Sequence, residues 1–298
     1  MIRFAAFAPL LLGLLIPSVA TSSPLAKEIE VNGVLLPYVE QGSGEPMIFV
    51  HGALSGTSSW EPVREKIAEK YRFITYMQRY YGSIAWKDDG RRFSISTHAD
   101  DLINFIASLA AGPVHLVGWS YGGAVAAAAA LKNPSLLRSL TLYEANIVSV
   151  LAAESPEGKI AREDRTKMVG PAVAANKAGD PVQAIRVMYE AVYQLPPGGF
   201  EHLPQTTKIR VLENARTMPL LFAAPQPPAI TCDALRKFTL PTLVMRGEKT
   251  HAFYVLITEG IGKCVQGARH VILKNVNHDG PARDPAAFSA AIFEFLSK

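Results

Sequence analysis

The stretch of sequence that decides the fold is VHLVGWSYGG, residues 114–123. An apolar run at 114–117 comes directly before the element Gly-x-Ser-x-Gly, and an alanine-rich run up to Lys132 follows it. The first run predicts a buried strand and the second a helix. A serine at a sharp turn from strand to helix holds its hydroxyl above the sheet. We therefore interpret Ser120 as a candidate nucleophile; the alternative is a tight glycine turn with an inert serine.

Small residues on both sides of Ser120 fit this interpretation. The strand and the helix of such an elbow pass close together, so larger side chains would collide there. Gly118 and Gly122 meet the requirement, and the alanine-rich row at 124–130 lets the helix lie tightly on the sheet.

Strand-like and helix-like patterns alternate on both sides of this elbow. Apolar runs typical of strands lie at 47–50, 73–76, 139–143, 242–245 and 270–273, and helical patterns lie at 60–71, 97–110, 253–261 and 285–296. Nearer the start, two short strand-like runs flank Asn32-Gly33, which is a strong hairpin signal. The alternation predicts an α/β fold in which helices flank a mainly parallel central sheet.

The alternation stops between residues 147 and 230. Helical patterns around 159–167 and 181–193 are followed by proline and glycine breaks. An insertion of this size between two strands predicts a helical lid over a site. We therefore divide the chain into a core formed by 21–146 and 231–298 and a lid at 147–230.

A serine hydroxyl is a feeble nucleophile at neutral pH and needs a base to take its proton. Of the seven histidines, His278 alone follows the last predicted strand, in the loop before the final helix. A triad in the chain order serine, acid, histidine has its histidine at this place. His278 is therefore the candidate base.

Together these features resemble the α/β-hydrolase superfamily over nearly all of the chain after residue 20. The matching elements are His51-Gly52 after the first buried strand, Arg79 to Gly82 after the next, the Ser120 elbow and His278. The resemblance implies the α/β-hydrolase fold and a catalytic triad. It leaves the substrate open, because this fold hosts many chemistries.

The acid of the triad is where the sequence departs from the commonest family pattern. The family usually has an aspartate shortly after the penultimate core strand, and Thr250 stands there. Some members, including certain haloalkane dehalogenases and lactone hydrolases, have the acid at the end of an earlier strand, where this chain has Glu144. A carboxylate there can hold the imidazole in the required tautomer. We expect Glu144 to be the acid, with Glu248 as the contender.

The oxyanion hole is expected to use main-chain amides, because these are rigid donors aimed at developing charge. One would be the N–H of Tyr121, directly after the nucleophile, and the other that of Ala53, after His51-Gly52. His51 itself is interpreted as structural.

Residues 1–20 predict a signal peptide, with Arg3 before an apolar run at 4–16 and a small-x-small site after it. The run is shorter than the roughly 20 residues that a membrane-spanning helix needs, although a membrane anchor is the alternative. We expect a secreted or periplasmic protein without a stable membrane anchor once the leader is removed. In such a protein Cys232 and Cys264 are expected to form a disulfide rather than remain two buried thiols.

Composition excludes several classes of function. The 298 residues are 49% hydrophobic and 19% charged, which is typical of a folded globular protein. The net charge of +4 comes from scattered residues, whereas nucleic-acid binding needs clustered Lys and Arg. There is no H-E-x-x-H, no paired C-x-x-C and no G-x-G-x-x-G after a strand, so no metal and no cofactor are expected.

Two groups of aromatic residues could either line a substrate pocket or pack in the core. They are Tyr76, Tyr80 and Tyr81 after an early strand, and Tyr189, Tyr193, Phe200 and Phe222 in the lid.

The sequence thus predicts a serine hydrolase that cleaves a small apolar carboxylic ester or lactone through an acyl-enzyme. The same triad could cleave a carbon–carbon bond in a diketone, or an amide. Haloalkane dehalogenase and epoxide hydrolase chemistry is disfavoured, because those family members have an aspartate where Ser120 stands. From another class, a ligand-binding or receptor-like protein could keep the fold without turnover.

Overall fold

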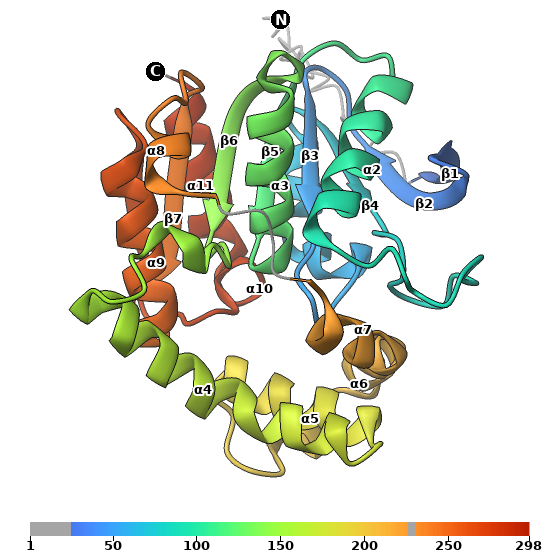
Figure 1. Cartoon of the computed structure of the whole chain (residues 1–298). Coiled ribbons are helices and arrows are strands. Elements are labelled where there is room, and N and C mark those ends of the chain that lie inside the picture. Colours follow the sequence, from blue (N-terminus) through green and yellow to red (C-terminus); the bar gives the residue numbers. More distant parts are fainter. Residues whose placement is uncertain (1–24, 226–229, 298) are drawn as a thin grey trace, which may run out of the picture.

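The computed structural model describes residues 25–225 and 230–297. The predicted signal peptide therefore lies outside the described residues. The central element is an eight-stranded sheet with the strand order β1-β2-β4-β3-β5-β6-β7-β8 (Figure 1). Its strands are β1 Leu25–Val31, β2 Val34–Gln41, β3 Pro46–Val50, β4 Arg72–Tyr76, β5 Val114–Trp119, β6 Leu137–Tyr143, β7 Thr242–Gly247 and β8 Arg269–Leu273.

The sheet is parallel except at one edge. β1 pairs with β2 and β2 with β4 in antiparallel orientation, and every other neighbouring pair is parallel. The β1–β2 hairpin turns at Asn32 and Gly33, whose φ angles of 50° and 74° are both positive, as a tight two-residue hairpin turn requires.

Helices cover both faces of the sheet (Figure 1). The described α-helices are α1 Glu61–Ala68, α2 Ile95–Ser108, α3 Tyr121–Lys132, α4 Pro156–Lys177, α5 Pro181–Val192, α6 Gln205–Leu212, α7 Met218–Ala223, α8 Cys232–Leu235, α9 Ala252–Cys264, α10 Gly280–Arg283 and α11 Pro285–Leu296. α2, α3 and α9 pack in one buried apolar cluster and α1 and α11 in another.

The two clusters follow from the two-residue period of a strand. All of β3 is buried, and its side chains alternate: Ile48 and Val50 join the cluster of α2, α3 and α9, while Met47 and Phe49 join that of α1 and α11. α3 lies tightly on the sheet, and its small residues from 122 to 130 are all buried. These features confirm the predicted fold class, an α/β-hydrolase fold with a mainly parallel sheet.

The helical insertion separates β6 from β7. α4, α5, α6 and α7 lie across the edge of the sheet at which the parallel strands end, as Figure 1 shows. α4 runs from Pro156 to Lys177 and is much longer than the helical pattern predicted at 159–167. Ser155 caps the start of α4, where its hydroxyl accepts a hydrogen bond from Gly158 N, and the helix continues through Pro171.

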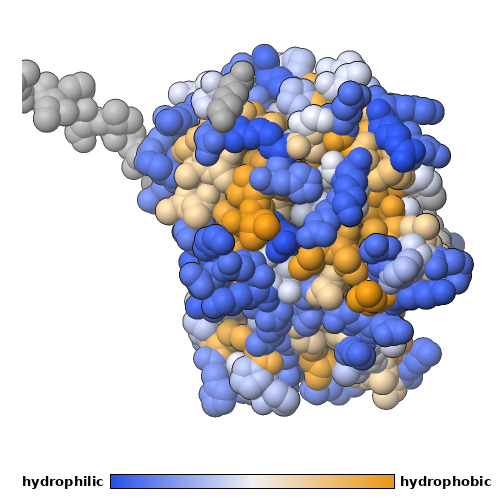
Figure 2. All heavy atoms as spheres, turned by 90° about the vertical axis from the view of Figure 1, so that its left-hand side faces the viewer, coloured by the Kyte–Doolittle hydropathy of each residue, from blue (hydrophilic) through white to orange (hydrophobic). Residues whose placement is uncertain are grey.

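A disulfide fixes the segment that follows the insertion to the end of α9. Cys232 at the start of α8 and Cys264 at the end of α9 form a disulfide, as the sequence predicts. The face that carries α8 and α9 shows apolar patches separated by hydrophilic side chains (Figure 2). Among the described residues, no helix combines the length and the apolar composition needed to cross a membrane.

Candidate active site

Ser120 lies at the turn between β5 and α3, with φ 56° and ψ −119°. A non-glycine residue in this region is strained, and such strain is common at functional sites. Main-chain bonds hold it: Ser120 N donates to Tyr143 O, and Asn146 N donates to Ser120 O, both at 3.0 Å. The main chain of Ser120 is therefore held beside the end of β6.

The glycines of the elbow are required by close approach of the main chain. A Cβ on Gly118 would lie 2.7 Å from Gly122 O, and one on Gly122 would lie 2.4 Å from both Val50 O and His51 O. Real Cβ atoms essentially never come this close to main-chain atoms. Any side chain at either position would push β5, α3 and the end of β3 apart.

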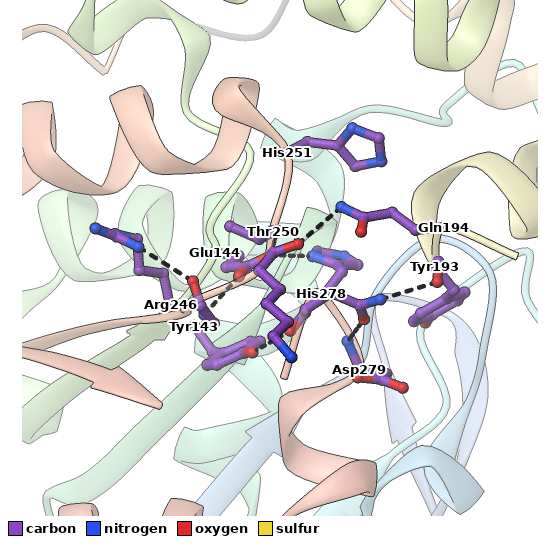
Figure 3. Close-up of polar contacts among 12 residues, drawn as sticks. Tyr143, Glu144, Tyr193, Gln194, Arg246, Thr250, His251, His278 and Asp279 are labelled. Carbon is purple, nitrogen blue, oxygen red and sulfur yellow. Dashed lines mark hydrogen bonds and ion pairs between the residues drawn. The ribbon is translucent and has the colours of Figure 1, made fainter. Parts of the chain in front are cut away.

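His278 and Glu144 form a buried pair (Figure 3). His278 Nδ1 lies 2.6 Å from Glu144 Oε2, and the two residues are only 2% and 0% exposed. A carboxylate accepts a hydrogen bond, so the neutral imidazole carries its proton on Nδ1 and has Nε2 free to accept another proton. The pair can therefore act as an oriented general base.

Glu144 is held by two further donors. Gly247 N donates to Oε1 at 2.8 Å, and Thr250 Oγ1 donates to Oε2 at 2.8 Å. Glu144 directly follows β6 and, like Ser120, has a positive φ angle, here 43°. Thr250, which stands where the family usually has its acid, thus hydrogen-bonds to the carboxylate that comes from the neighbouring strand. Three donors compensate for the burial of this charge.

Glu248 lies elsewhere. Its carboxylate is 3.1 Å from Lys274 Nζ and accepts a hydrogen bond from Asn275 N at 3.0 Å. Its side chain is 39% exposed. The structure therefore brings Glu144, and not Glu248, to His278.

Contacts with the insertion hold the loop of His278 (Figure 3). Tyr143 Oη donates to Asn277 O at 2.6 Å, and Asn277 Nδ2 donates to Tyr193 O at 2.9 Å. Next to Thr250, Gln194 Nε2 donates to Lys249 O at 2.9 Å. The loops that carry the pair are thus tied both to the sheet and to the end of α5.

Ser120 and His278 line the same cavity, and Tyr254 of α9 contacts both. The Tyr254 ring stacks on His278 with 4.1 Å between ring centres and 15° between planes. The phenol also lies close enough to the Ser120 side chain to interact with it. No hydrogen bond joins Ser120 to His278 among the described residues. Burial raises the pKa of Tyr254, so the phenol stays neutral.

The two predicted oxyanion donors lie beside Ser120. A Cβ on Gly52 would be 3.4 Å from Ser120 Cβ, which places the adjacent Ala53 next to the nucleophile. Tyr121 is the first residue of α3, so its N–H has no acceptor within the helix. Neither the Ala53 nor the Tyr121 amide donates to another residue in the described part of the chain.

His51 has a structural position. Its Nε2 accepts a hydrogen bond from Gln78 N at 3.1 Å, so Nδ1 carries the proton and donates to Gly52 O at 2.9 Å. Gln78 Nε2 in turn donates to His51 O at 2.8 Å. Burial lowers the pKa of His51 to about 4, so the imidazole is neutral at physiological pH. These bonds fix the loop that carries Ala53.

The cavity has a volume of about 790 Å³ and a mainly apolar wall. Its apolar side chains come from both the core and the insertion and include Leu54, Met168, Val169, Leu221, Phe222 and Phe253. Tyr193 also lines it, whereas Tyr189 packs edge to face against Phe200. The early aromatic group has the packing role: Tyr76 stacks on Phe105, and Tyr80 and Tyr81 pack against Phe93.

Comparison with known proteins agrees with this architecture. The model of the Alpha/beta hydrolase family matches residues 47–291. The chain therefore belongs to the Alpha/beta hydrolase family. In the described parts of the chain, no group of three or more His, Cys, Asp or Glu is placed to hold a metal ion.

Individual relatives have several activities. The 2-(acetamidomethylene)succinate hydrolase of Mesorhizobium japonicum is 29% identical over 238 residues, 78% of this chain and 81% of that protein. Among solved structures, the esterase EaEST of Exiguobacterium antarcticum has a TM-score of 0.73 at 19% identity and covers 92% of this chain and all of its own. Est816, described as an N-acyl homoserine lactone degrading enzyme, has a TM-score of 0.70 at 22% identity, covering 90% of this chain and 100% of its own. The two structural likenesses show the shared fold.

Proposed function

We propose that this chain is a serine hydrolase that cleaves a carboxylic ester or lactone through an acyl-enzyme. The observation that carries the proposal is the buried pair of His278 and Glu144, joined at 2.6 Å and facing the cavity that holds Ser120. A pair of this kind has an evident use in taking a proton from a serine hydroxyl.

In the proposed mechanism, the Ser120 side chain turns towards His278, and Oγ attacks the carbonyl carbon while its proton passes to His278 Nε2. The Ala53 and Tyr121 amides stabilise the oxyanion. The intermediate then collapses, the bond to the leaving oxygen breaks, and that oxygen takes the proton from His278. Water then attacks the acyl carbon while one of its protons passes to the same nitrogen. The bond between the acyl carbon and Ser120 Oγ breaks, Oγ takes that proton back from His278, and the acid product leaves.

The choice of esters and lactones is supported by the apolar wall and by the names of the two structural neighbours. Cleavage of an amide or of a carbon–carbon bond would use the same residues. The Mesorhizobium relative is named for an acetamido compound, which favours including amides in any substrate screen.

The test is labelling with a fluorophosphonate, together with turnover of p-nitrophenyl esters. The chain from residue 21 onward should be labelled, and Ser120→Ala should abolish both label and turnover. Ser149→Ala is the matched control, since Ser149 also lines the cavity and this variant should keep the label. A folded but unlabelled protein would contradict the proposal and favour the ligand-binding alternative.

We also propose that the protein is secreted or periplasmic. The leader-like residues 1–20 support this location, as does the Cys232–Cys264 disulfide, because such bonds persist in oxidising compartments. Fractionation of expressing bacterial cells should recover the processed chain outside the cytoplasm. Recovery of unprocessed chain in the cytoplasm or the inner membrane would contradict export.

A further inference from the structure

Two arginines of the insertion line the otherwise mainly apolar cavity. Arg162 and Arg165 lie one turn apart on α4 and belong to its cavity-lining face, which continues with Val169 and Val173. The spacings of three and four residues put these side chains on one side of the helix. The face is thus cationic near the start of α4 and apolar further along.

Neither arginine is neutralised by a neighbour. Neither guanidinium forms a hydrogen bond or an ion pair with a residue that the structure describes. Asp164 lies between them in the sequence, but its carboxylate accepts a hydrogen bond from Phe253 N at 2.8 Å and lies 3.9 Å from His251 Nδ1. Asp164 is therefore used for holding the start of α9, and Glu163, the other acid between the arginines, forms no ion pair with either of them among the described residues.

The position of the pair relates it to the reaction centre. Both arginines are exposed, so they lie where the cavity opens to solvent. Arg165 is nevertheless close enough to Tyr254 for its charge to act on that phenol, and Tyr254 contacts Ser120 and His278. A molecule with its reacting carbonyl at Ser120 could extend past Tyr254 towards the arginines.

We propose that Arg162 and Arg165 bind an anionic group, a carboxylate or a phosphate, at the end of the substrate remote from the bond that is cleaved. Guanidinium groups bind such planar or tetrahedral oxyanions through two parallel hydrogen bonds. The substrate class is therefore an amphiphilic acid: an apolar body that fills the cavity, with a charged end at the opening. This inference takes the site of cleavage from the proposed function, but binding of the anion does not depend on turnover.

Binding is tested first in the Ser120→Ala protein, which cannot turn over a substrate. The probes are hexanoate, hexyl phosphate and hexanol, measured by isothermal titration calorimetry, so that chain length is constant and only the head group changes. At least one anion should bind ten times more tightly than hexanol or better, and the stronger of the two identifies the head group. Equal affinities for all three probes, or no binding of either anion, would overturn the proposal.

Variants then assign the preference to the two arginines. In the Ser120→Ala protein, adding both Arg162→Gln and Arg165→Gln should weaken binding of the anion at least tenfold. The affinity for hexanol should change less than twofold. Lys167→Gln is the matched control, because it removes one exposed positive charge of α4 outside the cavity wall and should change neither value. An anion preference that survives in the double variant would show that the arginines are ordinary solvated residues.

Turnover separates this inference from the proposed function. The protein with Ser120 intact should hydrolyse mono-p-nitrophenyl adipate with a higher kcat/KM than its neutral methyl ester, and the double arginine variant should lose about tenfold of that preference through KM. Hydrolysis of neither ester, with anion binding retained, would count against the ester hydrolase proposal alone. Hydrolysis of both without any preference would overturn the anion site alone.

Discussion

The floor and the roof of the cavity are built in different ways. The floor consists of the ends of β3, β5 and β6 with the loop of His278, and the roof consists of α4 to α7. In the floor, main-chain atoms approach so closely that Gly118 and Gly122 allow no side chain. In the roof, a Cβ on Gly170 of α4 would meet no atom within 4 Å.

The difference teaches where chemistry and selectivity are encoded. The groups proposed for catalysis lie in the floor, where two residues with positive φ, Ser120 and Glu144, are over-determined by hydrogen bonds. The roof contributes side chains such as Arg162 and Phe222 to the cavity wall. The reaction is therefore tied to the fold, whereas substrate choice is tied to the insertion.

The sharpest test within the floor exchanges one atom at the end of β6. Glu144→Gln keeps the shape but offers His278 a neutral partner, so the imidazolium of the transition state loses its counter-charge. We expect kcat for a p-nitrophenyl ester to fall about 10⁴-fold, which corresponds to about 5.5 kcal/mol. Glu248→Gln, at the end of β7, should change kcat less than twofold. A larger loss from Glu248→Gln would reverse the assignment of the acid.

The connection between α8, which follows the roof in the chain, and α9 is tested by removing the disulfide that joins them. Replacing Cys232 and Cys264 by alanine frees a loop of about 30 residues in the unfolded chain, which should lower the free energy of unfolding by about 3.5 kcal/mol. Denaturant unfolding measures this change. Activity at 25 °C should remain, because neither cysteine lines the cavity. An equal loss of activity would mean that the link also positions α9 and Tyr254.

A matched pair of glycine substitutions compares the two regions directly. Gly122→Ala forces a methyl group to 2.4 Å from Val50 O and His51 O, and overpacking of this kind should cost about 3 kcal/mol of stability. Gly170→Ala meets open space within a helix and should be neutral or stabilising by up to about 1 kcal/mol. Thermal unfolding of both variants gives the comparison. Equal destabilisation would remove the contrast between floor and roof.

Much of the floor could be predicted from the sequence, because each structural requirement of the site restricts one position to a particular residue type. Close approach of strand and helix leaves glycines at 118 and 122, and a catalytic carboxylate leaves Glu144 after a strand that is otherwise apolar. The function of Thr250 could not be predicted, since its partner is 106 positions away in the sequence and is joined to it only by the pairing of β6 with β7.

The residues that line the cavity from the roof are harder to predict, because charged and apolar side chains on a helix have the same spacing whether they face a cavity, the core or solvent. Arg162 and Arg165 stand in a charged helix in which nothing about their spacing separates them from solvated residues. The contact of Tyr254 with the candidate site cannot be predicted from the sequence, because an aromatic residue in an apolar helix is usually part of the hydrophobic core. One signal was available: Ser155-Pro156 is a helix start of the usual kind and would have corrected the beginning of α4.

Acid should weaken the part of the core behind the floor through two buried histidines. Burial lowers the pKa of His51 to about 4 and of His98 to about 3, so both stay neutral in the folded protein. In the unfolded chain they take up protons below about pH 6.5, where the unfolded state therefore binds more protons. Stability should fall as pH drops from 6.5 to 4, by about 1.4 kcal/mol per pH unit for each histidine.

Two variants assign this pH dependence, read from denaturant unfolding at each pH. His98→Gln keeps a polar partner for Tyr121 Oη, which lies 2.7 Å from His98 Nδ1, but cannot titrate. It should reduce the slope by about half. His202→Gln removes an exposed histidine of the roof and should leave the slope unchanged. If both variants behaved alike, carboxylates rather than the buried histidines would control acid unfolding.

The smallest expected effect concerns Tyr254, which lies between floor and roof. Its phenol interacts with the Ser120 side chain and can compete with His278 for the serine hydroxyl. A neutral hydrogen bond contributes about 1 kcal/mol, so removing a competing phenol by Tyr254→Phe should raise the rate of fluorophosphonate labelling by roughly fivefold while the ring still stacks on His278. A tenfold fall in that rate would instead mean that the phenol assists the reaction, and the catalytic groups would then extend beyond the floor into α9.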